Sequence, residues 1–311
     1  MEIFRRLEDF PARFKGGAVS IGKFDGLHRG HAAILERVTS QARKKGAPSV
    51  VFTFDPSPAQ ILRPCDAPCA LCVPELKIEL LERAQIDALI LFPTTREFLA
   101  QTPTEFFQRV VVDALGATSL IEGANFCFGR DRSGDLAATT LFCASHGIDF
   151  EVVPSVSCDG NLVSSSAIRT LILDGDVARA SAFLGRPYRL RGIVDLGDQR
   201  GRTLGYPTAN LGATTTVLPA PGVYATTART EDGRVYASSV NVGGNPTFGI
   251  EKLKIEAHLL DFSGNLYGRR LDLDFLEKIR DVKTFDSKEA LLEQIRRDLS
   301  QTREIVTNQT L

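Results

Sequence analysis

Two short polar loops carry the residue types that could do chemistry in this chain. The first is Gly22-Lys-Phe-Asp-Gly-Leu-His28-Arg-Gly-His31, in which an H-x-G-H core lies between a strand-like and a helix-like stretch. The second is Gly201-Arg-Thr-Leu-Gly-Tyr-Pro-Thr208-Ala-Asn210, a Gly/Pro loop ending in small polar residues that suit a metal–phosphate group. Two unlike phosphate-handling loops imply two nucleotide sites. The sequence therefore predicts an enzyme with two activities.

The H-x-G-H loop has the composition of an anion site at the start of a helix. Unpaired backbone N–H groups and the positive end of the helix dipole favour a phosphate there, and Gly30 allows the backbone to approach it closely. The imidazoles of His28 and His31 would stabilise charge that builds on a pentacoordinate phosphorus and on leaving pyrophosphate. Two surface or capping histidines, or half of a zinc site, are the alternatives.

A second candidate phosphate loop is the segment Val163-Ser164-Ser165-Ser166-Ala167-Ile168-Arg169, which places three hydroxyls and a cation at another predicted helix start. Alone, it is a serviceable N-cap. Together with H-x-G-H in an α/β domain, it fits the phosphate-side loop of a nucleotidyltransferase.

The Gly/Pro loop is suited to Mg²⁺ and phosphate. Gly201 and Gly205 permit close approach of the backbone, and Pro207 stiffens the loop. The Thr208 hydroxyl and the Asn210 side-chain oxygen are hard ligands for Mg²⁺. No G-K-[ST] follows, so this is not a Walker A loop; a plain cluster of β-turns is the alternative.

The glutamate at position 256 stands in an otherwise apolar stretch, 254–260. It is either an exposed residue of an alternating strand or a base placed beside a substrate hydroxyl, and the pattern alone favours exposure.

The first part of the chain alternates short β-branched stretches with longer amphipathic segments. Such alternation predicts a parallel sheet with helices on both faces, an α/β nucleotidyltransferase-like (Rossmann-like) domain over residues 1–185. Ligands then bind beyond the carboxyl ends of the strands. The candidate strands are 18–21, 49–54, 88–92, 119–122 and 150–153, and the candidate helices are 32–44, 75–84, 104–115, 135–145, 165–173 and 177–184.

The pattern changes after Gly185–Pro187 to short alternating stretches separated by turns. This is typical of a small antiparallel β-barrel, and an amphipathic segment over 287–299 predicts a C-terminal helix. The second domain is therefore expected over 186–311. Its candidate strands are 188–194, 222–229, 235–242, 254–260 and 270–275.

Composition narrows the possible function classes. The chain is 43% hydrophobic and 24% charged, as expected for ordinary buried cores. A net charge of −1 offers no general basic surface for nucleic acid, and no apolar stretch approaches the roughly 20 residues of a membrane span. Acidic residues near the start argue against a signal peptide, so a cytoplasmic protein is expected. Cys65, Cys69 and Cys72 share the spacing of radical-SAM iron–sulfur sites, but reduced cytosolic thiols are the favoured interpretation.

The ordered set of motifs resembles the prokaryotic bifunctional riboflavin kinase/FAD synthetase family over essentially the whole chain. The resemblance implies phosphorylation of riboflavin to FMN by ATP, then adenylylation of FMN to FAD with release of pyrophosphate. Mg²⁺ would be the cofactor, ATP, riboflavin and FMN the partners, and weak self-association is left open. The matching segments beyond the two loops are Phe54-Asp-Pro-Ser-Pro58, Gly123–Gly129, Ser164–Arg169, Asn241–Phe248 and Glu256–Phe262.

The resemblance also implies roles for single residues. His28 and His31 would act on the ATP phosphates and the transition state, with Asn125 beside the transferring groups. Glu256 would take the proton from the ribityl 5′-hydroxyl of riboflavin. Ser57 and Asn125 stand where the family often has His and Asp, and Val282 replaces a common acid. Further substrate- or nucleotide-binding residues would be Gly22, Phe24, Asp25, Gly30, Ser164, Ser165, Arg169, Gly201, Gly205, Pro207, Asn245, Thr247, Arg280 and Phe285, with Thr208 and Asn210 on the metal.

Two other function classes remain open on the sequence. One is a single-activity cytidylyl- or adenylyltransferase whose β-domain only binds or regulates, against which the joint presence of Thr208, Asn210 and Glu256 argues. The other is a non-enzymatic flavin-binding regulator, which would have no need of H-x-G-H.

Overall fold

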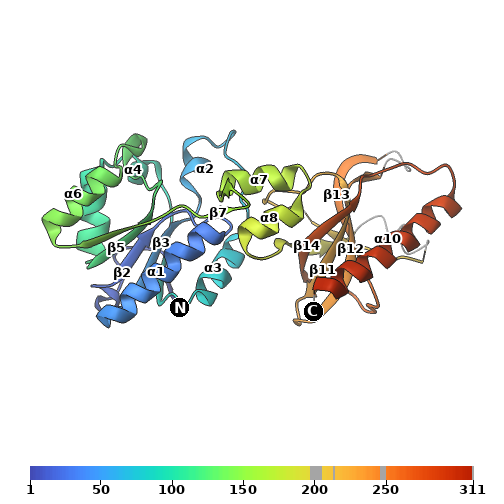
Figure 1. The fold of residues 1–311 in the computed structure, drawn as a ribbon, viewed down its shortest axis with the longest axis horizontal. Coiled ribbons are helices and arrows are strands. Elements are labelled where there is room, and N and C mark those ends of the chain that lie inside the picture. The colour runs from blue at the N-terminus through green and yellow to red at the C-terminus, as the bar shows by residue number, and fades with distance from the viewer. Residues whose placement is uncertain (197–204, 213, 246–249, 310–311) are drawn as a thin grey trace. The chain divides into compact units, whose positions relative to one another are not determined.

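A computed structural model describes residues 1–196, 205–212, 214–245 and 250–309 (Figure 1). The chain forms two compact units, each described by itself below. The first comprises Met1–Cys69 and Pro74–Val163, and the second comprises Ala70–Val73 and Ser164–Leu311.

The first unit is built on a six-stranded parallel sheet in the order β1-β4-β3-β2-β5-β6 (Figure 1). The inner strands are nearly continuous apolar runs because both faces of a parallel sheet are covered. The strands are β1 (Glu2–Phe4), β2 (Ala18–Ile21), β3 (Ser49–Phe54), β4 (Ala88–Phe92), β5 (Ser119–Gly123) and β6 (Asp149–Val153). The parallel sheet is confirmed; β1 was not expected.

Helices cover both faces of this sheet. Neighbouring strand residues belong to different apolar clusters: Val19 and Phe52 pack on one face, and Ala18 and Val51 on the other. A two-stranded sheet, β7 (Ser157–Cys158) with β8 (Asn161–Leu162), lies near the end of the unit. The helices are η1 (Ala12–Phe14), α1 (Arg29–Lys45), α2 (Pro58–Leu62), α3 (Pro74–Arg83), α4 (Arg96–Leu99), α5 (Pro103–Phe106), the π-helical η2 (Phe107–Ala114), η3 (Arg130–Arg132) and α6 (Leu136–His146).

The strand order reverses between β2 and β5. From β2 the chain moves outward through β3 and β4, and β5 then pairs with the other side of β2. Such a switch point opens a crevice beyond the carboxyl ends of the two strands, where α/β sheets bind their ligands. The loop that carries His28 follows β2, and the turn that carries Asn125 follows β5.

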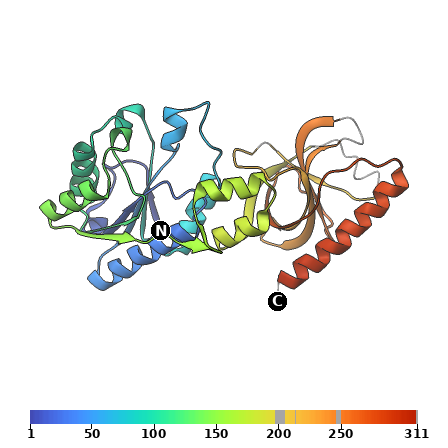
Figure 2. The ribbon, with the colours of Figure 1, turned by 45° about the horizontal axis from the view of Figure 1, so that its top comes forward.

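The second unit is a closed antiparallel barrel in the order β10-β13-β12-β11-β14-β9. Figure 2 shows α10 along one side of it, where it contacts β11, β12 and β14. The strands are β9 (Tyr188–Asp195), β10 (Ala209–Leu211), β11 (Gly222–Thr230), β12 (Val235–Asn245), β13 (Ile250–Leu259) and β14 (Arg270–Arg280); the helices are α7 (Ser165–Leu173), α8 (Val177–Leu184) and α10 (Lys288–Gln309). The expected barrel and C-terminal helix are confirmed, with the helix longer than the segment 287–299.

Helices α7 and α8 belong to the compact unit of the barrel. The amide of Ala220 donates to the carbonyl of Ile172 at 3.2 Å, and α8 packs on β9 and β14. The sequence pattern assigned both helices to 1–185 because they continue the α/β alternation of that part. No helix in the described ranges is long and apolar enough to cross a membrane.

Strands β9 and β14 are joined by a buried network of opposite charges. Arg191 makes two hydrogen bonds of 2.7 Å to Asp272, which is 2% exposed. Beside them, Arg189 makes two of 2.6 Å to Asp274. Each pair lies directly opposite in the register of the two strands. The network satisfies charges that would be costly to bury alone.

We expect Asp272→Ala to destabilise the second unit by about 3–5 kcal/mol, because it leaves a buried guanidinium without its counter-charge. All five tyrosines lie in this unit and the chain has no tryptophan. Tyrosine fluorescence during urea unfolding therefore follows this unit alone. The exposed pair of Arg297 with Glu293 supplies the control: Glu293→Ala should change stability by less than about 1 kcal/mol. Equal effects of the two substitutions would contradict the prediction.

Candidate functional site

His28 caps the first helix of the α/β unit. Its backbone is extended, and its Nδ1 accepts a hydrogen bond from the backbone N–H of His31 at 3.3 Å. Because Nδ1 is the acceptor, a neutral ring carries its proton on Nε2. The capping role that the sequence left open is therefore present, and it fixes the tautomer and orientation of a side chain at the positive end of the helix.

The two imidazoles are stacked. Their centroids lie 3.7 Å apart at an interplanar angle of 17°, and the ring of Phe24 lies 5.3 Å from that of His31. Phe24 is 2% exposed and belongs to the core cluster of α1. The structure thus places this predicted binding residue in the core, where it supports the His31 ring.

The glycines of the loop are required by neighbouring rings. A Cβ added to Gly30 would lie 3.1 Å from Cε1 of His28, and one added to Gly22 would lie 3.1 Å from Cε2 of Phe24. The sequence alone indicated that Gly30 lets the backbone approach a phosphate closely. The structure supplies a further reason, because Gly30, two residues after the cap, leaves room for the His28 ring.

The turn after β5 lies against the first part of α1. A Cβ on Gly123 would lie 3.2 Å from Cδ1 of Ile34 and 3.5 Å from Oδ1 of Asn125, and the amide of Phe126 closes the turn on the Gly123 carbonyl at 3.0 Å. Asn125 itself is exposed. The first unit therefore brings Asn125 and the histidine pair to the same crevice, beyond β2 and β5.

The serine loop begins α7 in the second unit. The Ser164 hydroxyl accepts from the amide of Ala167 at 3.2 Å, so this side chain is an N-cap, as its sequence alone suggested. Ser165 and Arg169 are half-buried on the same helix. The preceding residue, Val163, belongs to the first unit, and its carbonyl would be 4.0 Å from a Cβ on Gly30.

In the barrel, strand register brings the predicted kinase residues together. Asn210 of β10 lies opposite Glu256 of β13, which lies opposite Asn241 of β12. Ala209 and Ala257 alternate with these residues and face the barrel interior, so the polar row lies on the outer face. Residues directly opposite have Cβ atoms roughly 5 Å apart.

The same outer face offers oxygen ligands for a metal ion. Thr208 lies directly before β10, two residues before Asn210, and both residues are half-buried. These hard donors suit Mg²⁺, which keeps several waters and takes phosphate oxygens as its remaining ligands. The described residues contain no group of three or more His, Cys, Asp or Glu side chains able to hold a metal ion.

Other predicted residues have different surroundings. Gly205 and Pro207 are exposed, and the Pro207 carbonyl lies 2.8 Å from Nδ1 of His258. Arg280 is bound to Asp298 of α10, at 2.7 Å for the shortest contact, and lies 5.8 Å from the Phe285 ring. Its guanidinium thus anchors a helix, where the resemblance had implied flavin contact.

The remaining predicted residues are Asp25, three residues of the second domain and the three clustered cysteines. Asp25 is half-buried in the histidine loop. Gly201 and Thr247 lie outside the described residues, and Asn245 is described only as the last residue of β12. Cys65 and Cys69 are exposed, and Cys72 is buried.

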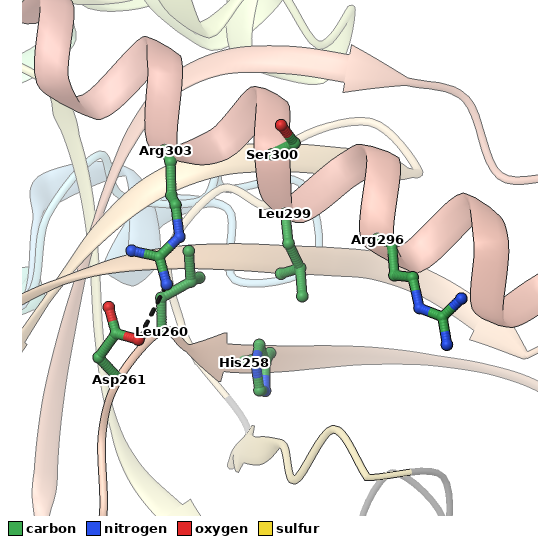
Figure 3. A pocket seen from close by; sticks show the side chains of 7 residues that line it. All are labelled: His258, Leu260, Asp261, Arg296, Leu299, Ser300 and Arg303. Carbon is green, nitrogen blue, oxygen red and sulfur yellow. Dashed lines mark hydrogen bonds and ion pairs between the residues drawn. The ribbon is translucent and has the colours of Figure 1, made fainter.

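A cavity of about 360 Å³ lies between β13 and α10 (Figure 3). His258, two residues beyond Glu256 on the same outer face, lines it, as do Arg296 and the pair of Arg303 with Asp261 (2.8 Å). Leu260, Leu299 and Ser300 complete the lining. This partly cationic hollow is large enough for part of a small organic substrate.

Sequence reasoning missed three polar residues at these sites. Asn241 and Asp195 extend the row beside Glu256 and Asn210, and only their strand register could have shown it. Glu122, a buried acid at the end of β5, hydrogen-bonds the end of β2. An acid in an apolar strand was its one visible signal.

Two family models match the chain in succession. FAD synthetase matches residues 11–167, and riboflavin kinase matches residues 184–306. A bifunctional riboflavin kinase/FMN adenylyltransferase of Pseudomonas fluorescens is 35% identical over 304 residues, covering 97% of each protein. The chain belongs to this family. Relatives of the same name from Escherichia coli K12 and Bacillus subtilis are 33% and 32% identical, covering 93% and 90% of this chain and 93% and 89% of theirs.

A solved structure supports the fold. The structure titled macrolide-efflux protein from Streptococcus pneumoniae matches with a TM-score of 0.86 and 32% sequence identity, over 97% of this chain and 98% of that chain. Its title differs from the names of the curated relatives. Family membership therefore rests on the sequence matches, which agree over both halves of the chain.

Because a Cβ at position 30 would crowd the His28 ring, we expect Gly30→Ala to affect stability and catalytic activity differently. Gly30→Ala should preserve or raise helix stability, yet displace the ring and lower FMN adenylylation about 10-fold or more. Thermal unfolding and the rate of FAD formation measure the two effects. Ala32→Gly, at an exposed position of the same turn, is the matched control and should keep the rate. A wild-type rate in Gly30→Ala would contradict the steric account.

Proposed function

We propose that the barrel unit phosphorylates riboflavin to FMN and that the α/β unit adenylylates FMN to FAD. Membership in the bifunctional family over both halves of the chain supports the pair of activities. The geometry supports their division: a histidine pair at the switch point of a parallel sheet, and a glutamate among amide side chains on a barrel face. We retain 1–185 and 186–311 as the proposed limits of the two functional domains.

Adenylylation needs positioning and charge stabilisation rather than a covalent nucleophile. An FMN phosphate oxygen attacks the α-phosphorus of ATP, and the bond to the departing pyrophosphate breaks. In this proposal the Nε2–H of His28, fixed by its Nδ1 acceptor role, and the stacked His31 bind phosphate oxygens as charge moves onto them. The N-terminus of α1 adds its dipole.

Riboflavin phosphorylation needs a base. Glu256 accepts the proton of the ribityl 5′-hydroxyl, the resulting oxygen attacks the γ-phosphorus of ATP, and the bond to ADP breaks. The adjacent amides of Asn210 and Asn241 orient the carboxylate and the nucleotide. A bound Mg²⁺ would neutralise phosphate charge, with Thr208 and Asn210 as its protein ligands. In this proposal the cavity lined by His258, two residues beyond Glu256, takes part of the flavin.

The cellular setting is part of the same proposal. Riboflavin, FMN and ATP are the small-molecule partners. The free thiols of Cys65, Cys127, Cys143 and Cys158 favour a reducing compartment, and the cytoplasm is the proposed location.

Incubation with riboflavin, ATP and Mg²⁺, followed by chromatographic separation of the flavins, tests the whole assignment. Formation of both FMN and FAD is expected. FMN without FAD would mean a silent α/β site. FAD formed only from added FMN would leave a single-activity adenylyltransferase, and no turnover would leave a flavin-binding protein.

Removal of either histidine should separate the two activities. His28→Ala or His31→Ala is expected to abolish FAD formation while riboflavin phosphorylation stays near the wild-type rate, because the kinase residues lie in another unit. The loss should fall mainly on kcat. Equal loss of both activities in a folded variant would overturn the two-site assignment.

Glu256→Gln keeps the shape of the side chain but cannot accept a proton. FMN formation should fall by about 10²–10⁴-fold, whereas adenylylation of added FMN should persist because its phosphate nucleophile is already ionised. Binding of Mg²⁺–ADP, measured by calorimetry, should also persist. Near wild-type phosphorylation of riboflavin would show that Glu256 is only an exposed strand residue.

A further inference from the structure

The end of β5 carries a buried carboxyl group to which the proposed mechanism gives no role. Glu122 is 2% exposed, and its Oε1 accepts a hydrogen bond from the backbone N–H of Ile21 at 2.7 Å. Ile21 is the last residue of β2, and Glu122 is followed by Gly123, the last residue of β5. This bond therefore joins the two strand ends from which the His28 loop and the Asn125 turn depart.

The carboxyl takes the place of a backbone acceptor at the switch point. The regular pairing of β2 with β5 ends at Val19 and Leu120. Continuing the same register would place Ile21 opposite Glu122. The strands are instead held there by a side chain, which is longer than a carbonyl and allows the crevice to begin.

The direction of the Ile21 amide explains why such an acceptor is needed. The next amide, that of Gly22, donates to the carbonyl of Phe52 on β3 at 3.0 Å. Because successive amides of a strand point to opposite sides, the Ile21 amide points toward β5. Without the Glu122 carboxyl, a buried N–H directly before the histidine loop would lose its acceptor.

The surroundings of the carboxyl favour its neutral form. Burial raises the pKa of Glu122 well above its ordinary value, against the opposing effect of the hydrogen bond from the Ile21 amide. From α6, on the covered face of the sheet, the Cys143 thiol is the titratable neighbour; burial, with Glu122 contributing, raises the pKa of Cys143 to about 11. Glutamine, which resembles a neutral carboxyl group in shape, is therefore the conservative replacement.

We propose that Glu122 is a positioning residue for adenylyl transfer, which sets the spacing between the strand ends that carry the histidine pair and Asn125. The inference rests on the proposed assignment of adenylylation to the first unit. A displacement of about 1 Å at such a site costs roughly 100-fold in rate, so the acceptor should matter although it touches no substrate.

The test compares Glu122→Gln, Glu122→Val and the control Cys143→Ala in the full chain. The last alters packing beside the carboxyl but keeps the bond to Ile21. Each variant is assayed for FAD formation from added FMN, with kcat and KM determined separately, for riboflavin phosphorylation and for thermal unfolding. We expect Glu122→Val to lower kcat for FAD about 10–100-fold with riboflavin phosphorylation unchanged, and Glu122→Gln and Cys143→Ala to stay within about 3-fold of wild type.

Three results would overturn the inference. One is a folded Glu122→Val that keeps the wild-type kcat for FAD. Another is loss of activity in Glu122→Gln as large as in Glu122→Val, since charge rather than the acceptor would then be needed. If Glu122→Val does not fold, Glu122→Asn takes its place, because its amide is one methylene too short to reach Ile21. The third result is then a kcat for FAD formation in Glu122→Asn equal to that of Glu122→Gln. Failure of the wild type itself to form FAD would refute the proposed function instead.

Discussion

The first site depends on the hydrogen bond by which His28 caps α1. Between β2 and this cap the chain forms a loop in which Phe24, Gly26 and Leu27 all have positive φ, at 45°, 76° and 37°. Such backbone costs about 1–3 kcal/mol for each non-glycine residue. Burial of the Phe24 and Leu27 side chains, 2% and 8% exposed, offsets a similar amount. The core thus holds a strained loop in one shape, and the helix start receives two stacked imidazoles.

In the barrel, strand register alone positions the candidate site residues. Glu256 is half-buried on the outer face of the barrel because Ile255 and Ala257 face the interior, and a slip by one residue would turn it inward. Two neighbours, β10 and β12, fix this register from both sides. Strand β10 has only three residues, so the partners of Asn210 depend on the longer strand beside it. A short strand between two long ones can carry ligands without needing strong pairing of its own.

Sequence patterns predicted the elements whose signal is strong and local. The inner strands of the sheet were found because they are apolar on both faces, whereas β1 and β10 are too short to show a period. Residue types singled out the histidine loop and, in the barrel, Asn210 and Glu256, but not their neighbours Asn241 and Asp195 in the outer row. They could not show that the Phe24 ring packs beside the His31 ring, or that Arg280 binds Asp298. Nor could they pair Glu122 with a backbone amide, because contacts across a sheet depend on the strand order.

The contact between Gly30 and the His28 ring bears on how this motif can diverge. Glycine is commonly explained in such a loop by its backbone freedom, but here it also clears space for a particular side chain, since a Cβ would lie 3.1 Å from that ring. The two positions are therefore coupled through volume. In relatives that retain the histidine, a larger residue at position 30 should be rare; where the histidine has been replaced by something smaller, that restriction is lifted. Pairwise covariation at these two positions would thus report whether the cap persists in a distant homologue, even where the catalytic activity has changed.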